Sequence, residues 1–206
     1  MPYRAVIFDL GGVVVGSPLH AIAAYERAQN LPAGCINRVV VDTAPAGAWS
    51  RLERGELTLE AFYRAFDADC AAAGVAISAR ALMQRVAESV APRPAMLDAI
   101  RVIRARGLLA GAITNNWAVE DGGTSTLRPH FDVFIESAAV GMRKPDPRIF
   151  HLACGELGVT PQESIFLDDI GLNLKAARAL GMTTIKVEDP DTALAALSGT
   201  LGFPLR

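Results

Sequence analysis

Short apolar runs alternate with helical patterns along this 206-residue chain, and this alternation is the feature that most constrains its fold. Apolar runs cover residues 5–8, 108–113, 133–135 and 165–167, and residues 183–187, which include two Thr and one Lys, are predicted to form a fifth strand. Strands that are covered on both faces read as unbroken apolar runs, and parallel strands need a crossover connection between them. We therefore predict an α/β protein built on a doubly wound parallel sheet.

The first crossover is much longer than the others. Ser17-Pro18 has the form of an N-cap followed by proline in the first helical position, and apolar residues then recur at helical spacing. We predict that residues 16–93 form a small helical module, inserted into an α/β core of residues 1–15 and 94–206. Residues 117–130 show no regular periodicity and are predicted to form a loop.

The composition favours a compact protein that acts on small molecules. Hydrophobic residues make up 51% of the chain and charged residues 20%, and 22 acids against 20 bases give a net charge of -2. Because no basic stripe could neutralise a nucleic-acid backbone, we expect no nucleic-acid partner. Charges interrupt every apolar stretch, and the N-terminus lacks the zones of a signal peptide, so we expect no membrane anchor and a cytoplasmic location. A monomer or a homodimer is expected.

Polar residues follow the predicted strands where each strand ends. They are Asp9 with the Gly11-Gly12 turn, Thr114-Asn115-Asn116, Lys144, and the pair Asp168-Asp169. The carboxyl ends of parallel strands meet at one edge of the sheet, where ligands bind. Carboxylates from two strands could hold Mg²⁺, and a hydroxyl, an amide and an ammonium are what a phosphoryl group needs. The pattern predicts a phosphoryl-transfer site.

Four segments of the chain carry a family resemblance. They are Tyr3-Arg4-Ala5-Val6-Ile7-Phe8-Asp9, Ile113-Thr114-Asn115-Asn116, Gly141-Met142-Arg143-Lys144-Pro145-Asp146-Pro147 and Phe166-Leu167-Asp168-Asp169-Ile170-Gly171. In this order they resemble the motifs of the haloacid dehalogenase superfamily, and the helical module is similar to the cap of its first cap class. Within that superfamily the segments look most like the phosphatase-like N-terminal domains of soluble epoxide hydrolase and of acyl-CoA dehydrogenase family member ten.

The resemblance implies a role for each carboxylate. Asp9 would attack phosphorus and form an aspartyl phosphate, which water then hydrolyses. Asp169, with Asp9 and the backbone carbonyl of Gly11, would hold Mg²⁺. Asp168 would orient Lys144 or a metal-bound water. The substrate would be a small phosphorylated molecule.

The resemblance also implies a phosphate cradle. Thr114 and the backbone of Asn115 would hold the phosphoryl oxygens, and Lys144 would offset the charge of Asp9 and the phosphate. Gly12 and Asn116 are counted with Gly11 among the substrate-binding residues. Trp117, Trp49, Arg51 and Tyr25 are candidates for setting specificity, although each could equally pack in a core.

One position departs from the resemblance. Most phosphatases of this superfamily carry a second Asp two residues after the nucleophile, and this group protonates the leaving oxygen. Here the position is Gly11. Losing a general acid commonly lowers the rate by about 10² to 10⁴. We therefore expect a stabilised leaving group, as in a sugar 1-phosphate or an acyl phosphate, or a proton from the substrate or the cap.

Two other functions stay open at this point. A hydrolytic 2-haloacid dehalogenase also uses a lone Asp nucleophile, but it needs no metal, which leaves the pair Asp168-Asp169 without a role. A catalytically degenerate phosphate-binding or interaction domain would be consistent with the missing general acid. Metal-dependent phosphate release and metal-independent halide release distinguish these functions.

Overall fold

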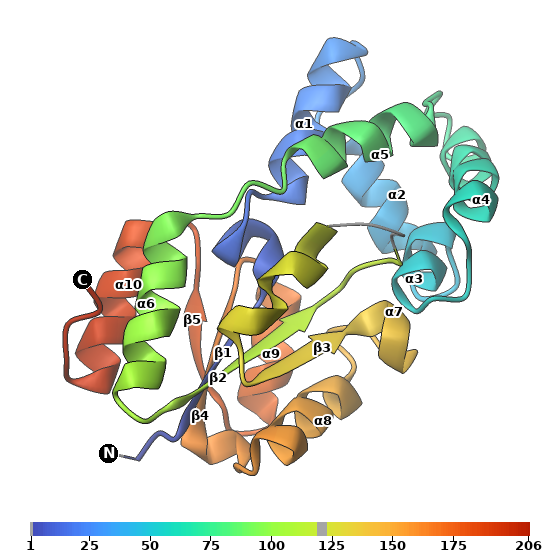
Figure 1. Cartoon of the computed structure of the whole chain (residues 1–206). Helices are drawn as coiled ribbons and strands as arrows, with labels where there is room; N and C mark the ends of the chain where they lie inside the picture. Colours follow the sequence, from blue (N-terminus) through green and yellow to red (C-terminus); the bar gives the residue numbers. More distant parts are fainter. Residues whose placement is uncertain (1, 119–122) are drawn as a thin grey trace.

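A parallel sheet forms the centre of the computed structural model, which describes residues 2–118 and 123–206 (Figure 1). Five strands run in the order β3-β2-β1-β4-β5, all parallel. They are β1 (Ala5–Phe8), β2 (Leu109–Thr114), β3 (Val133–Glu136), β4 (Ser164–Asp168) and β5 (Thr183–Lys186). The apolar runs of the sequence are these strands, so the predicted α/β class is confirmed.

Helices cover both faces of the sheet, as a doubly wound fold requires. On one face lie α6 (Pro94–Ala105) and α10 (Pro190–Leu201), and on the other lie α8 (Pro147–Leu157) and α9 (Gly171–Ala179) (Figure 1). Side chains alternate along a strand, so Val6 and Phe8 of β1 pack under α6 while Ala5 and Ile7 pack under α8. The sheet is therefore buried on both sides, and its strand ends face outward.

Within the segment between β1 and α6, five helices form a core of their own, and we call them the helical insertion. They are α1 (Pro18–Ala28), α2 (Cys35–Thr43), α3 (Ala48–Glu53), α4 (Leu59–Ala72) and α5 (Ala79–Glu88). Trp49, Phe62 and Phe66 meet at its centre, with ring centroids 5.2 to 5.7 Å apart. The insertion lies beside the strand ends of β1 and β2 (Figure 1).

Three carboxylates bind the N-termini of helices in the helical insertion. Glu26 of α1 accepts hydrogen bonds from the backbone N–H groups of Gly34 (2.7 Å) and Ile36 (2.9 Å) at the start of α2. Asp69 and Asp67 of α4 likewise accept from the first residues of α3 (2.8 Å) and α5 (2.7 Å). Helix N-termini present unpaired donors and partial positive charge, so these acids fix where each helix begins.

Two linkers join the helical insertion to the sheet, and they run side by side. Val15 pairs with Pro92 in an antiparallel bridge, and Gly16 N–H donates to Ala91 O at 3.1 Å. A Cβ on Gly16 would lie 2.0 Å from the carbonyl oxygen of Ser89, so this approach requires glycine. The division at residues 16–93 stays a prediction, and the paired linkers support it.

Short elements complete the described chain. They are the helical turns η1 (Leu10–Val14), η2 (Gly123–His130) and η3 (Pro161–Glu163), and the short helix α7 (Ser137–Val140). The loop predicted for residues 117–130 was wrong in its second half, where η2 forms, and residues 119–122 lie outside the described residues. Among the helices described, none is long and apolar enough to cross a membrane.

Candidate active site

The predicted site residues meet where the strand order reverses. The order in which the chain adds strands to the sheet reverses between β1 and β4. Asp9 follows β1, Asp168 ends β4 and Asp169 follows β4. Asp9 N–H donates to Leu167 O at 2.8 Å, so the two strand ends are level. Thr114 ends β2 on the other side of β1 and is buried. Such a switch point is the usual ligand site of an open α/β sheet.

Lys144 is fully buried between two of these carboxylates. Its Nζ lies 2.8 Å from Asp9 Oδ1 and 2.8 Å from Asp168 Oδ2. Burial alone would lower the pKa of Lys144, but Asp168 and Asp9 together raise it. Burial raises the pKa of Asp9 well above its usual range, and the Lys144 ammonium opposes this shift. The lysine is therefore a fixed cation beside Asp9.

Asp168 has its own set of partners behind the site. Asn173 Nδ2 donates to both of its oxygens, at 3.1 and 3.0 Å, and Ile170 N–H donates to Oδ1 at 2.7 Å. Asp168 is completely buried, so these bonds and Lys144 satisfy a charge that water cannot reach. This geometry suits the predicted role of Asp168 in orienting Lys144.

The side chain of Asn115 binds the chain around Lys144. Asn115 Oδ1 accepts from Lys144 N–H at 2.8 Å, and Asn115 Nδ2 donates to Lys144 O at 3.0 Å. Asn116 Nδ2 donates to Glu136 at 2.8 Å. Asn116 N–H also donates to Ser137 Oγ at 2.9 Å, so of these two residues the backbone of Asn115 is the part that remains for the predicted phosphate cradle.

Three carboxylates could hold a divalent cation. Asp9, Asp168 and Asp169 each place an oxygen within 4.8 Å of the others, and we call them the aspartate cluster. Burial, followed by the charge of Asp168, raises the pKa of Asp169 to about 6. Lys144 supplies one positive charge against three carboxylates. A cluster of hard oxygen ligands with excess negative charge fits Mg²⁺.

The glycine turn brings the backbone against the aspartate cluster. Gly12 has a φ of 76°, and a Cβ there would lie 2.1 Å from Asp169 Oδ2. Gly11 has ordinary angles (φ -60°, ψ 127°), but its Cβ would lie 3.1 Å from Pro18 Cδ. Arg93 donates from NH1 to Gly12 O at 2.8 Å. The position of the usual second Asp is therefore faced by a proline ring.

A cavity of about 950 Å³ opens beside these residues. Gly11 and Thr114 line it from the sheet edge, while Leu57 and Val86 line it from the helical insertion and Trp117 from the loop after β2. The other specificity candidates do not line it: Trp49 and Tyr25 are buried in the core of the insertion, and Arg51 lies 3.5 Å from Glu56. The cavity walls are predominantly apolar.

Charged groups at the cavity wall are already paired. Among the described lining residues there is no Lys, Arg or His, and the charged ones are Glu56 and Glu136. Glu56 lies 2.5 Å from Arg54, and Glu136 lies 2.5 Å from Arg128. The side-chain hydrogen bond from Arg54 lowers the pKa of Glu56. Each carboxylate at the cavity wall is therefore paired with an arginine.

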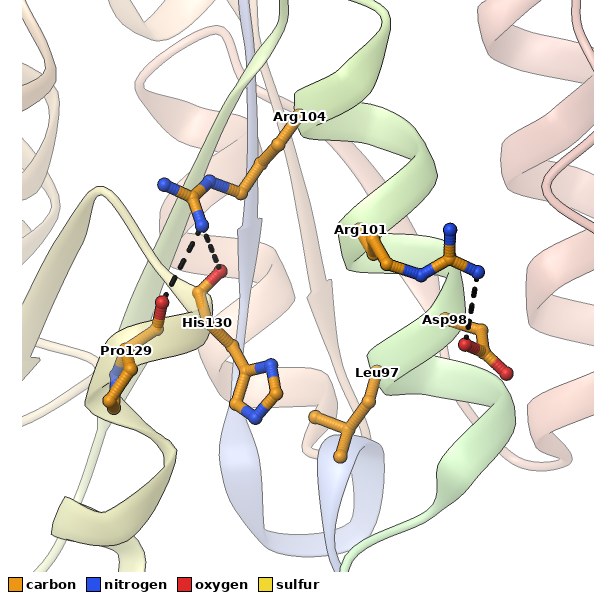
Figure 2. A pocket seen from close by; sticks show the side chains of 6 residues that line it. All are labelled: Leu97, Asp98, Arg101, Arg104, Pro129 and His130. Atoms are coloured by element: carbon orange, nitrogen blue, oxygen red, sulfur yellow. Dashed lines mark hydrogen bonds and ion pairs between the residues drawn. The ribbon is translucent and has the colours of Figure 1, made fainter.

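A second hollow, of about 220 Å³, lies away from the site between α6 and η2 (Figure 2). Its arginines are engaged: Arg101 contacts Asp98 at 3.2 Å, and Arg104 donates to the carbonyls of Pro129 and His130. It has no connection with the aspartate cluster.

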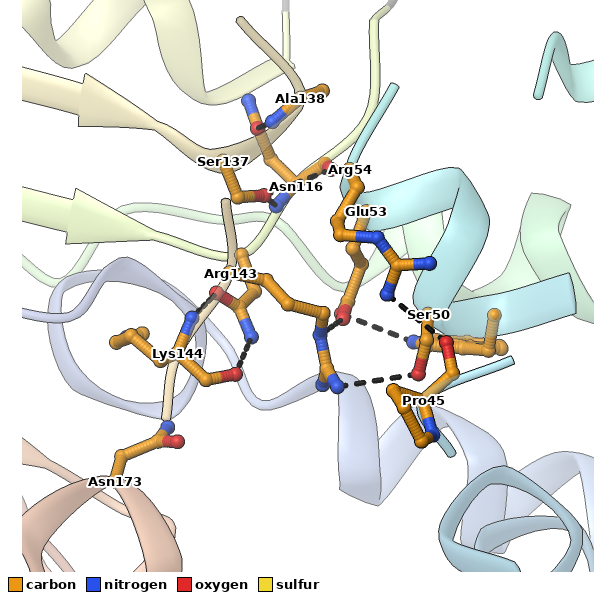
Figure 3. A network of polar contacts seen from close by, with 12 residues as sticks. Pro45, Ser50, Glu53, Arg54, Asn116, Ser137, Ala138, Arg143, Lys144 and Asn173 are labelled. Atoms are coloured by element: carbon orange, nitrogen blue, oxygen red, sulfur yellow. Dashed lines mark hydrogen bonds and ion pairs between the residues drawn. The ribbon is translucent and has the colours of Figure 1, made fainter. Parts of the chain in front are cut away.

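Sequence reasoning missed a contact next to Lys144. Arg143 Nε lies 2.5 Å from Glu53 Oε2 in α3, without hydrogen-bond geometry, and Arg143 NH1 donates to Ser50 Oγ at 3.2 Å (Figure 3). Burial raises the pKa of Glu53, and Arg143 opposes this shift. The position of Arg143 beside Lys144 was a signal for it, but Glu53 carries no local signal.

Comparison with known proteins agrees with this geometry. The model of the haloacid dehalogenase-like hydrolases matches residues 3–181. The chain belongs to this family of hydrolases. The resemblance of its four motifs to the haloacid dehalogenase superfamily is therefore confirmed.

Some relatives of this haloacid dehalogenase-like (HAD-like) hydrolase are longer proteins, and the chain matches only a part of each. Over 98% of its own length, this chain is 41% identical to mouse acyl-CoA dehydrogenase family member 10. Over 100% of its own length, it is 34% identical to pig bifunctional epoxide hydrolase 2. The chain spans 20% and 40% of the lengths of these two relatives. It is also 28% identical to phosphoglycolate phosphatase of Shigella boydii, over 88% of the chain and 80% of that protein.

A solved structure shares the fold. A HAD family enzyme from Bacteroides thetaiotaomicron, in complex with magnesium and inorganic phosphate, superposes with a TM-score of 0.64. The match covers 89% of this chain and 93% of that one at 19% identity. At this identity the likeness concerns the arrangement of strands and helices.

Proposed function

We propose that this HAD-like hydrolase is a Mg²⁺-dependent phosphatase that acts on a small phosphate ester or anhydride. The observation that carries the proposal is the buried Lys144, held between Asp9 and Asp168 beside a third carboxylate, Asp169. A fixed cation next to a nucleophile and a cluster of oxygen ligands suit a phosphoryl group, whose charge must be offset. The phosphatase among the relatives supports the same function.

The protein groups divide the reaction between them. Asp9 attacks phosphorus, the ester oxygen leaves, and water then hydrolyses the aspartyl phosphate to regenerate the carboxylate. Thr114 and the backbone of Asn115 bind phosphoryl oxygens, and Lys144 offsets their charge. Asp9, Asp169 and Gly11 O would hold Mg²⁺, which when bound would neutralise charge on the phosphoryl group. Asp168 keeps Lys144 in place.

The cavity favours a substrate whose organic part is neutral and apolar. Its walls include Leu57, Val86 and Trp117, and its carboxylates are paired with arginines. A carboxylate on the substrate would lose its hydration there without meeting a cation among the described lining residues. The apolar lining favours an acyl or aryl phosphate over a sugar 1-phosphate, because sugar hydroxyls would find few partners.

The missing general acid favours a leaving group that needs no proton. Gly11 offers none, and the lining carboxylates Glu56 and Glu136 are ion-paired. Without protonation, departure of a basic alkoxide is slower by about 10² to 10⁴, so aryl and acyl phosphates are expected to react faster than alkyl phosphates. Equal rates for an aryl and an alkyl phosphate of similar size would contradict this expectation.

Phosphate release with and without Mg²⁺ tests the proposal. We expect the wild-type protein to hydrolyse p-nitrophenyl phosphate only with Mg²⁺, and the Asp9→Asn variant to be inactive. The Asp98→Asn variant, changed on the exposed surface of α6, is the matched control. Metal-independent chloride release from 2-chloropropionate would instead indicate a dehalogenase. Phosphate binding without turnover of any ester or anhydride would indicate a binding domain.

A further inference from the structure

We propose that Glu53 is a positioning residue: by pairing with Arg143 while the helical insertion lies over the sheet edge, it fixes the segment that carries Lys144. Glu53 belongs to α3 of the insertion, whereas Arg143 precedes Lys144 in the loop between α7 and α8. The pair therefore joins the two parts of the chain at the residue that precedes Lys144 (Figure 3).

One face of α3 holds the Arg143 side chain. Glu53 lies 2.5 Å from Nε, and Ser50, one turn earlier, accepts from NH1 at 3.2 Å. Trp49 Nε1 donates to the other carboxylate oxygen of Glu53 at 3.0 Å. Trp49, Ser50 and Glu53 are all buried, so α3 presents a preformed acceptor site for one guanidinium.

The Lys144 segment is held from both sides. On the sheet side the Asn115 carboxamide binds Lys144 N–H and Lys144 O, at 2.8 and 3.0 Å. On the insertion side α3 holds Arg143, the next residue. Since consecutive residues share a peptide plane, the position of Arg143 restricts the backbone from which Lys144 reaches Asp9.

Close backbone packing accompanies this pair. Gly55, which follows α3, has a φ of 71°, and a Cβ there would lie 2.4 Å from Ala138 O in α7. Trp49 packs edge-on against Trp117 of the loop after β2, with ring centroids 6.3 Å apart. The helical insertion is thus seated on the sheet edge through α3, and displacing it would break the Glu53–Arg143 pair.

The ion pair between Glu53 and Arg143 is partly buried, with side-chain exposures of 9% and 22%. Removing two charges from water costs about as much as their attraction returns, so such a pair favours one arrangement more than it strengthens the fold. The Glu53–Arg143 contact itself lacks hydrogen-bond geometry, and the hydrogen bonds from Arg143 to Ser50 and from Trp49 to Glu53 orient the two side chains. Glu53 therefore favours the seated position of the insertion more than it stabilises the fold as a whole.

Hydrogen exchange and activity test this inference together. The expected change in activity rests on the proposed phosphatase function. The expected change in hydrogen exchange is measured without substrate and does not rest on that function. In Glu53→Gln we expect the linker amides of Gly16 and Arg93, which bond to Ala91 O and Val14 O, to exchange about tenfold faster. We expect kcat/KM for p-nitrophenyl phosphate to fall about tenfold.

Matched variants separate positioning from general damage. Glu60→Gln removes an exposed ion pair with Arg80 in the same insertion and is expected to change neither measurement. The double variant Glu53→Gln/Arg143→Met leaves no unpaired buried charge. We expect it to recover the stability lost in Arg143→Met but not kcat/KM, because the segment is no longer held.

The outcomes are distinguishable. Unchanged exchange at Gly16 and Arg93 in Glu53→Gln would overturn the inference, whatever the activity. Faster exchange with unchanged kcat/KM would overturn the positioning role. Faster exchange in a protein whose wild type releases no phosphate would support the structural coupling and refute the proposed function. A kcat/KM of the double variant equal to that of the wild type would also overturn the positioning role.

Discussion

The two sides of the cavity are held together by different forces. On the sheet side, Asp9 and Asp168 are buried carboxylates at strand ends, and the buried Lys144 from the loop between α7 and α8 lies between them and offsets their charge. On the insertion side, Leu57 and Val86 present apolar surface supported by an aromatic core. We infer that the sheet side performs the chemistry, and that the insertion side and Trp117 choose the substrate.

The largest expected effect is loss of the nucleophile on the sheet side. Asp9→Asn keeps the shape of the side chain but not its charge, and we expect kcat to fall by about 10³-fold or more. Circular dichroism should show a folded protein, because the neutral amide is cheaper to bury than the carboxylate. Activity above about a tenth of the wild-type value would exclude Asp9 as the nucleophile.

Removal of the buried cation should destabilise the sheet side most. Lys144→Met leaves Asp9 and Asp168 buried without a counter-charge, so we expect a loss of about 3 to 5 kcal/mol in the free energy of unfolding. Urea denaturation measures this loss. The matched variant Lys175→Met, in α9 outside the site, should stay within about 0.5 kcal/mol of wild type. Equal losses in both variants would contradict the arrangement described above.

Magnesium should act on the sheet side alone. At about 100 times its dissociation constant, the ion should stabilise the protein by about 2.7 kcal/mol. For a chain of this size we expect the melting temperature to rise by about 5 to 10 °C. Chelation with EDTA should reverse the rise, and Asp169→Asn should reduce or abolish it. An Asp169→Asn protein that responds like wild type would exclude Asp169 as a ligand.

The smallest effect is expected on the apolar side. Trp117→Ala removes an aromatic wall of the cavity, and we expect KM for p-nitrophenyl phosphate to rise about tenfold, with kcat changed less than about threefold. Steady-state kinetics separates the two constants. A larger effect on kcat than on KM would mean that Trp117 contributes to the chemistry as well as to binding.

The sequence predicted that Asp9 and Asp168 lie close together because the information for this is local. Asp9 and Asp168 follow buried apolar runs, and the topology of a parallel sheet brings such residues together without knowledge of any side-chain contact. Only part of the role of Asn115 could be predicted from the sequence. Its amide was noticed, but its partner Lys144 lies 29 residues away, and the hydrogen bonds between them depend on the path of the loop.

The insertion side could not be predicted to the same degree. Trp49 and Tyr25 have the chemistry of binding residues, yet both are buried in the apolar cluster of the insertion. The Glu53–Arg143 pair joins residues that are distant in sequence, and nothing near Glu53 distinguishes it from a surface acid. Gly11 showed in the sequence that the usual general acid is missing. That the Pro18 ring lies beside Gly11 could be learned only from the structure.

The paired linkers have a consequence for how such a protein can change. Gly16 and Ala91 are hydrogen-bonded to each other, so the two ends of the helical insertion lie side by side. The insertion is therefore attached to the core at one place, as a tight turn would be. Insertions with adjacent ends are tolerated because they leave the host framework undisturbed. A different set of helices could be grafted between these two residues to supply a new binding wall, while the strands and their catalytic side chains remained in place.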